Sequence, residues 1–200
     1  MEMQRPWSQR IVTLLLAAYF VLGYLPINAF NQARGLYHTV ALPGEEQIPF
    51  MVPFILGYCL VYGSFALIYF TVPSWEVFKK VAWGFFWVTT VHYFIFVLYP
   101  VKMIWRPEIA NPTNVFEWIA RFFFYLDRPF NCFPSLHVAY PTMAAVLSYR
   151  FIPKLFKIYV VMAVLTAVSV VVIKQHYILD AVGGALVAIV VGVLIPQKTA

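Results

Sequence analysis

A histidine and an aspartate lie four residues apart in the stretch from Lys174 to Asp180. On a helix, His176 and Asp180 would share one face and could form a hydrogen bond. A carboxylate bonded to one imidazole nitrogen fixes the tautomer of the ring and makes the other nitrogen more basic. That nitrogen would then be a good nucleophile towards phosphorus. A pair that only caps a helix near a membrane surface accounts equally well for this spacing taken alone.

A second histidine follows a helix-start pattern in Phe133-Pro134-Ser135-Leu136-His137. Ser135 suits the N-cap of a helix, and Pro134 fixes the direction of the chain entering it. The free N–H groups at a helix start bind anions. His137 would lie close to them and, when protonated, could give a proton to a leaving oxygen. On its own, this stretch is better explained as a capped helix with an interfacial histidine.

Cations lie in a third stretch, at Lys102 and Arg106-Pro107. The guanidinium of arginine can bind two phosphate oxygens at once. Taken alone, both residues are better explained as anchors at the membrane surface. All three stretches are expected at helix ends on one side of the protein, and this convergence predicts a phosphate site.

The composition requires that lipid surround the elements that position these residues. The chain has 200 residues, of which 62% are hydrophobic and 11% are charged. Soluble domains have about 25% charged residues. The net charge of +6 does not indicate nucleic-acid binding, because the basic residues form no run interleaved with aromatic residues. Cys59 and Cys132 do not have the spacing of a zinc site.

Six apolar segments approach the roughly 20 residues that a membrane span needs. They are Ile11–Phe30, Ile48–Val72, Val81–Val101, Phe130–Tyr149, Ile158–Ile173 and Tyr177–Ile195. We therefore predict an all-α integral membrane bundle of six transmembrane helices, in one domain over residues 1–200. A short amphipathic segment, Phe116–Leu126, is predicted to lie in the membrane interface.

The basic residues favour an orientation with both termini in the cytoplasm. Eight of them fall on the inner side in that orientation: Arg5, Arg10, Lys79, Lys80, Arg150, Lys154, Lys157 and Lys198. Six fall on the outer side: Arg34, Lys102, Arg106, Arg121, Arg128 and Lys174. The site is then expected on the extracytoplasmic face of a plasma or inner membrane. Asp127 and Arg128 are expected to form a structural ion pair, and Glu45 and Glu46 to lie in a solvated loop.

Together the three stretches resemble the signature of the type 2 phosphatidic acid phosphatase superfamily. Its motifs are Lys-x6-Arg-Pro, Pro-Ser-Gly-His and Ser-Arg-x5-His-x3-Asp. The chain has Arg106-Pro107, then Pro134-Ser135-Leu136-His137, then Ser169 with His176 and Asp180 at the family spacing. It departs from the pattern at Tyr99 and Val170, where the family has lysine and arginine. Leu136 and the His176-Tyr177 pair resemble the branch of inositol phosphorylceramide and sphingomyelin synthases.

The resemblance implies a mechanism that needs neither metal nor cofactor. His176 would attack phosphorus to form a phosphohistidine, Asp180 would orient it, and His137 would protonate the leaving group. The implied phosphate ligands are Ser135 and Arg106, with Lys174 expected to supply the charge of the arginine missing at Val170, and Lys102 is a further candidate. The predicted function is a membrane lipid phosphatase whose substrate is a lipid phosphate in the bilayer. A lipid phosphotransferase would use the same residues. A small transporter is a non-enzymatic alternative, although its charges should be spread across the membrane rather than gathered at one face.

Overall fold

A computed structural model describes residues 7–197 of the chain, so Arg5 and Lys198 lie outside the described residues. Every named element in the described part is a helix, and the only strand-like feature there is an isolated bridge between His38 and Val101. The all-α prediction is therefore confirmed.

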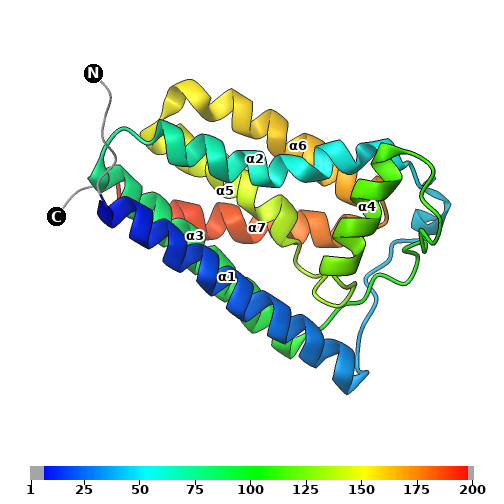
Figure 1. Cartoon of the computed structure of the whole chain (residues 1–200). Helices are drawn as coiled ribbons and strands as arrows, with labels where there is room; N and C mark the ends of the chain where they lie inside the picture. The colour runs from blue at the N-terminus through cyan, green and yellow to red at the C-terminus, as the bar shows by residue number, and fades with distance from the viewer. Residues whose placement is uncertain (1–6, 198–200) are drawn as a thin grey trace.

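Seven α-helices follow one another along the described chain. They are α1 (Trp7–Arg34), α2 (Ile55–Thr71), α3 (Trp75–Leu98), α4 (Val115–Leu126), α5 (Leu136–Phe151), α6 (Phe156–Val172) and α7 (Ile178–Leu194). Short 3-10 turns occur at η1 (Glu45–Gln47), η2 (Val52–Phe54) and η3 (Pro153–Leu155). The long helices run side by side, whereas α4 crosses them at one end (Figure 1). This arrangement matches the predicted short helix between the third and fourth segments.

Four helical segments between residues 7 and 197 are long and apolar enough to cross a membrane. They are Trp7–Arg34, Val52–Thr71, Trp75–Leu98 and Pro153–Val172. The apolar helix α7 is shorter, with 17 residues, and α5 has 16. At about 1.5 Å per residue, α5 is about 24 Å long, less than the roughly 30 Å of a bilayer core. The four longer segments indicate an integral membrane protein.

The helix starts differ from those of the expected segments: α1 starts before Ile11, α5 starts at Leu136 rather than Phe130, and the starts of α2 and α3 differ for local reasons. The segment expected from Ile48 to Val72 is not one helix, because Pro49 and Pro53 lie near its start and α2 begins only at Ile55. Proline lacks the N–H that a helix interior needs. Helix α3 begins earlier than expected because the Ser74 hydroxyl accepts a hydrogen bond from the backbone N–H of Val77 and caps the helix.

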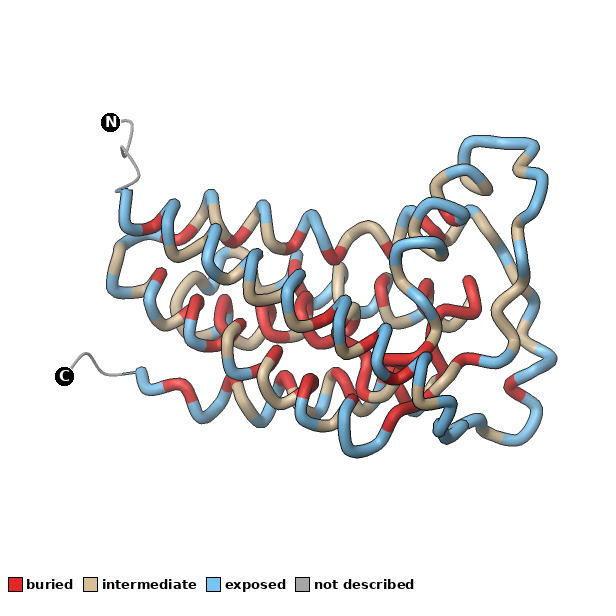
Figure 2. The backbone as a smooth tube through the Cα atoms, turned by 60° about the horizontal axis from the view of Figure 1, so that its bottom comes forward, coloured by how far each residue is buried: buried red, intermediate tan, exposed pale blue. Residues whose placement is uncertain are grey.

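Helix α5 is the centre of the bundle. It packs against α2, α3, α6 and α7, whereas α1 packs along α3. Ala139, Met143 and Leu147 on α5 are completely buried. Buried positions concentrate in the interior and towards the end with the long connections, whereas the outer helices are largely exposed (Figure 2). His137 lies in the first turn of this central helix, so dense packing fixes its backbone.

Two glycines let the start of α7 approach the start of α5 closely. A Cβ atom on Gly184 would lie 2.2 Å from the carbonyl oxygen of Ser135, and one on Gly183 would lie 2.7 Å from the Phe133 ring. The Ser135 N–H donates to the Asp180 carbonyl over 2.9 Å. The second and third chemical stretches are thereby held together, although 39 residues separate their histidines.

Candidate active site

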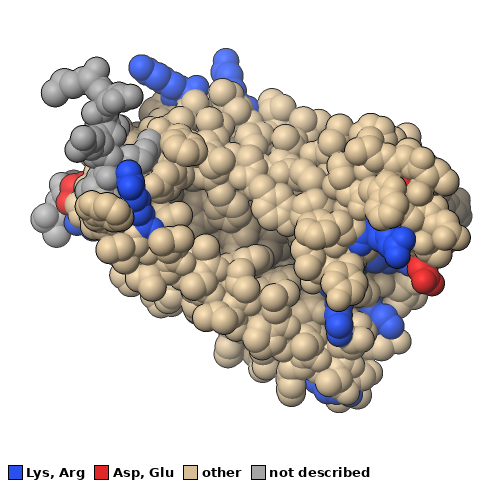
Figure 3. Space-filling view, viewed as in Figure 1, with Lys and Arg blue, Asp and Glu red and all other residues tan. Residues whose placement is uncertain are grey.

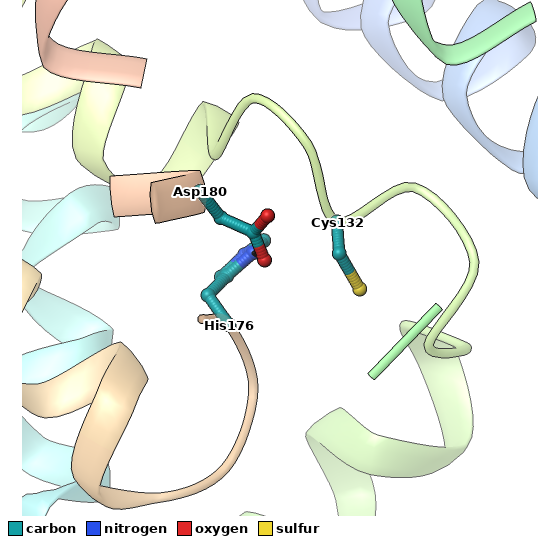
Figure 4. A group of neighbouring side chains, drawn as sticks. All are labelled: Cys132, His176 and Asp180. Atoms are coloured by element: carbon teal, nitrogen blue, oxygen red, sulfur yellow. Dashed lines mark ion pairs between the residues drawn. The ribbon is translucent and has the colours of Figure 1, made fainter. Parts of the chain in front are cut away.

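His176 and Asp180 form the predicted pair, although not on one helix, because His176 lies in the turn before α7 and Asp180 lies in the first turn of α7. His176 Nδ1 lies 3.4 Å from Asp180 Oδ2, and both side chains are almost completely buried. The same oxygen accepts a hydrogen bond of 2.9 Å from the Tyr177 N–H, so the carboxylate is fixed by the start of its own helix. Figure 4 shows the carboxylate directed at the imidazole. The Nε2 atom of His176 is left facing away from Asp180.

The second histidine lies directly against that nitrogen. His137 Nδ1 is 3.1 Å from His176 Nε2. If His176 Nδ1 carries the proton directed at Asp180, then His176 Nε2 has no proton and accepts the hydrogen bond. His137 Nδ1–H must then be the donor. The structure therefore brings the predicted nucleophile and the predicted acid into contact.

Asp127 lies on the far side of His137, where sequence reasoning placed no site residue. Its Oδ2 atom is 3.8 Å from His137 Nε2. The carboxylate also accepts hydrogen bonds from the Tyr24 hydroxyl of α1 and, over 2.5 Å, from Gln175 Nε2. Two carboxylates thus flank two histidines in the order Asp180, His176, His137, Asp127.

The prediction of an ion pair between Asp127 and Arg128 is wrong. Among the described residues no ion pair joins them. Arg128 instead donates to the Gln32 side chain, and its carbonyl accepts a hydrogen bond of 2.8 Å from Asn28. Asp127 is free to face the site because α1 supplies the contacts that hold this loop.

Ser135 caps α5, as the sequence predicts. It is completely buried, and its hydroxyl accepts a hydrogen bond of 3.4 Å from the Val138 N–H. Because its backbone N–H donates to the Asp180 carbonyl, Ser135 also ties the start of α5 to the start of α7.

Arg106 is a predicted cation that contacts Asp127 directly. Its Nη1 atom donates to the Asp127 carbonyl over 2.5 Å, and its Cζ atom lies 4.9 Å from the centre of the Phe124 ring. Its Nε atom is buried and has no hydrogen-bond partner among the described residues. A buried donor without an acceptor favours an anionic ligand. Arg106 can therefore offer a charged N–H group beside Asp127.

Lys102 and Lys174 make other contacts. Lys102 Nζ lies 4.8 Å and 5.0 Å from the ring centres of Tyr37 and Phe130, respectively. Lys102 and Arg106 also line one depression of about 650 Å³. Lys174 Nζ donates to the carbonyls of Glu45, over 3.1 Å, and Glu46, over 3.4 Å. Burial lowers the pKa of Lys174. The structure thus does not bring these two ammonium groups to the histidines.

Glu45 is not part of a solvated loop, so that expectation is wrong. It is only 4% exposed, and its Oε1 atom accepts a hydrogen bond of 2.5 Å from the Ile178 N–H. The carboxylate therefore caps the first turn of α7, close to Asp180. A carboxylate near a helix N-terminus is electrostatically favourable. No local spacing connects Glu45 with α7, so this contact could not be predicted from a motif.

Aromatic rings form one wall of the site. The Tyr58 ring centre lies 4.5 Å from that of His137, and Phe123 lies 5.2 Å from Tyr58. Sequence reasoning did not identify Tyr58, Tyr24 or Gln175 as site residues, because Tyr58 and Tyr24 come from segments without a motif and Gln175 occupies a position at which the third motif specifies no residue. For Asp127, the one signal was its position just before the second motif.

Cys132 lies beside the His176–Asp180 pair (Figure 4). One potential ligand atom from each of the three residues lies within 4.8 Å of the others. Thiolate, imidazole and carboxylate are all zinc ligands. Burial raises the pKa of the Cys132 thiol, which favours the neutral thiol over the thiolate that binds zinc. The neighbouring imidazole nitrogen, His176 Nδ1, already faces Asp180.

Comparison with known proteins identifies the family. No curated protein and no solved structure matches the chain significantly. The family model described as the PAP2 superfamily matches residues 37–194, which include both histidines, Asp180, Asp127 and Arg106, but not α1. That superfamily generally comprises phosphatases, which indicates phosphatase-type activity here. Because the match covers well over half of its length, the chain belongs to the PAP2 superfamily.

Proposed function

We propose that this protein is a metal-independent lipid phosphate phosphatase that forms a phosphohistidine at His176. The observation that carries the proposal is the 3.1 Å contact between His176 Nε2 and His137 Nδ1. This contact supports the proposal, because a phosphoryl group that enters between the candidate nucleophile and the candidate proton donor would touch both.

In the first step, His176 Nε2 attacks phosphorus while the bond from phosphorus to the alcohol oxygen breaks. His137 gives a proton to that oxygen, so the lipid alcohol leaves neutral. Asp180, 3.4 Å from Nδ1, stabilises the positive charge that develops on the attacking ring.

In the second step, water attacks the phosphohistidine and the bond between phosphorus and nitrogen breaks. His137, now neutral, takes the proton from the attacking water. Inorganic phosphate is released, and both histidines return to their starting protonation states, so the cycle consumes only water and the lipid phosphate.

Asp127 is proposed as the positioning residue for His137. Both ring nitrogens of His137 face acceptors, namely His176 Nε2 at 3.1 Å and Asp127 Oδ2 at 3.8 Å. Two acceptors suit a ring with protons on both nitrogens, which is the form that can act as an acid. Asp127 would therefore favour the acid form of His137, as Asp180 orients His176.

Positive charge for the phosphoryl oxygens is proposed to come from Arg106 and from the first N–H groups of α5. The unpartnered Nε of Arg106 supports the first assignment. The Ser135 cap supports the second, because it fixes the helix start whose N–H groups attract anions. Lys102 and Lys174 would contribute at longer range.

We also propose six membrane spans, both termini in the cytoplasm and the site on the extracytoplasmic face of a plasma or inner membrane. Helix α1 begins and α7 ends at the same end of the bundle, opposite α4, which supports an even number of crossings (Figure 1). A cysteine at Pro112→Cys should be labelled by an impermeant reagent from outside, and one at Pro153→Cys should not. The reverse pattern would overturn the orientation.

The test of the activity is an assay of detergent-purified protein on phosphatidate, phosphatidylglycerophosphate and an isoprenyl diphosphate, with and without alcohol acceptors. Phosphate release without an acceptor is expected. Leu136 and the His176-Tyr177 pair, which resemble the synthase branch, favour phosphotransfer as the second candidate. Turnover that needs an alcohol acceptor would select that candidate, and no turnover on any lipid phosphate would overturn both.

A further inference from the structure

An apolar groove leads from His137 into the membrane-spanning part of the protein. Helix α1 packs along α3, whereas α2 packs along α5 and α6. Figure 3 shows the result on this face of the molecule, a hollow between α1 and α2 that is free of charged side chains. The hollow consists of two adjoining chambers.

The outer chamber reaches the active site. Its volume is about 210 Å³, and its walls come from α1, α2, α4 and the start of α5. His137 and Asp127 are part of its lining. The rest of the lining is apolar or aromatic, for example Val21 and Val61. A molecule in this chamber would therefore have one end at the acid of the proposed reaction.

The inner chamber continues the groove away from the site. It also has a volume of about 210 Å³ and lies between α1, α2, α3 and α5. Phe20 and Tyr140 line both chambers, so these two rings mark the boundary between them. The Tyr140 hydroxyl is 2.9 Å from Thr89 Oγ1, which holds the ring in place. The α1 wall from Thr13 to Leu25 is about 18 Å long at about 1.5 Å per residue.

The lining of the groove and the chemistry of the site at its outer end decide which ligand fits. Apart from His137 and Asp127 at its outer end, the groove is lined by uncharged and mainly apolar side chains, which favour a hydrocarbon chain, and the site at that end favours a phosphate. The wall formed by α1 lies outside the matched residues 37–194, so it is a feature of this chain rather than of the family match.

We propose that the groove binds one hydrocarbon chain of the lipid phosphate whose phosphoryl group reacts at His176, which rests on the proposed function. The first part of the chain lies in the outer chamber, and a long chain passes Phe20 and Tyr140 into the inner chamber. The protein thereby selects long-chain lipid phosphates.

The test compares hydrolysis of butyl phosphate and hexadecyl phosphate by full-length protein in detergent. Ala17 is an exposed residue of α1 that lines the inner chamber, and the adjacent, exposed Ala18 lines neither chamber. Ala17→Trp should lower kcat/KM for hexadecyl phosphate by roughly 10-fold or more, because several methylene groups lose their apolar contacts. It should leave butyl phosphate unchanged, and the matched control Ala18→Trp should leave both unchanged.

The outer chamber has its own matched pair of variants. Val21 is exposed and lines that chamber, whereas the neighbouring Leu22 is exposed and lines neither. Val21→Trp should lower kcat/KM for both substrates, and Leu22→Trp for neither. Turnover of butyl phosphate by Ala17→Trp shows that this variant is folded.

The outcomes separate the two proposals. If wild-type protein hydrolyses both substrates and Ala17→Trp affects them equally or not at all, the groove proposal is overturned while the phosphatase proposal stands. Wild-type protein that hydrolyses short but not long chains would also overturn the groove alone. If neither substrate is hydrolysed while phosphatidate is, the single-chain groove is again overturned, and inactivity on all three would overturn both.

Discussion

The two histidines are held in the site by different means. At the turn between α6 and α7, His176 is paired with Asp180, a residue of its own segment. At the start of α5, His137 faces Asp127, which lies in the preceding loop and is held there by Tyr24 of α1 and by Gln175. The first pair joins a residue of the turn to the first turn of the helix that directly follows it, whereas the second depends on the packing of three distant segments. The comparison suggests that the proposed nucleophile is fixed locally and the proposed acid is fixed by tertiary structure.

The largest expected effect follows from removing the nucleophile. His176→Ala should lower turnover by about 10⁴-fold or more on every phosphate ester, since no covalent intermediate can form. His137→Ala should lose about 10²- to 10⁴-fold on an alkyl phosphate but much less on an aryl phosphate, whose phenol leaves without a proton. Steady-state rates on both esters, with mass spectrometry of acid-labile phosphate trapped on the protein, check the prediction.

The control for these variants is His38→Ala, because His38 lies in the connection between α1 and α2 and its ring stacks on Tyr99 with 4.2 Å between ring centres. Its activity should be close to that of the wild type. Trapped phosphate on His137, or equal loss on both esters in His137→Ala, would mean that the two roles are reversed.

Substituting Asp180 should slow the same esters as substituting His176, and substituting Asp127 should slow the same ester as substituting His137. Asp180→Asn should slow both esters, on the order of 10²- to 10⁴-fold, because the attacking ring loses its tautomer. Asp127→Asn should slow the alkyl ester by about 10-fold or more and spare the aryl ester, because it acts only through the acid. Losing a neighbouring carboxylate destabilises a protonated imidazole, so the alkaline limb of the pH–rate profile of Asp127→Asn should move to lower pH.

A purely structural role for Asp127 makes a different prediction. It would slow both esters alike and leave the pH–rate profile in place. Asp127→Glu, which keeps the charge, should recover part of the alkyl activity and restore the profile. The comparison fails if Asp127→Asn and Asp180→Asn cannot be distinguished by leaving group.

The same contrast explains what could be predicted from the sequence. The His176–Asp180 pair and the Ser135 cap were predictable, because each joins residues only a few positions apart at the start of a helix. The long apolar helices were predictable from composition, although the proline residues delay the start of α2. The contacts of Asp127 with Tyr24 and Gln175 were not, because they join positions 103 and 48 residues apart.

Lys174 shows most clearly what the spacing of a motif cannot predict. The family pattern suggested Lys174 as a replacement for the arginine missing at Val170, but spacing does not give the direction of a long side chain. In the structure the ammonium group points to the Glu45 and Glu46 carbonyls, because the chain reverses at Lys174 with φ of 54°. Arg106, the weaker motif match, lies beside Asp127 instead.

The cations provide a smaller test of the site. Arg106→Met should lower turnover by about 10²- to 10³-fold, as expected for a lost charge partner of the transition state. Lys174→Met should cost less than about 10-fold in turnover and destabilise the fold by about 1–2 kcal/mol, because charged hydrogen bonds to two carbonyls are lost. Turnover and thermal unfolding of both variants are the measurements. A loss of 10²-fold or more in Lys174→Met, without loss of stability, would restore Lys174 as a phosphate ligand.

The smallest expected effect concerns the thiol beside the nucleophile. Cys132 lies next to His176 and Asp180, and these three residues have ligand types that could hold zinc. If the pair works by orienting an imidazole, a metal on His176 Nδ1 would displace the contact with Asp180 that the reaction needs. Dialysis against a chelator should therefore leave turnover unchanged, and Cys132→Ala should keep activity within a few-fold of the wild type while creating a small cavity. Loss of turnover in both experiments, with recovery of the dialysed wild-type protein on addition of zinc, would show that Asp180 and Cys132 hold a metal. Asp180 would then be a metal ligand, and its pair with His176 would no longer correspond to the pair of Asp127 with His137.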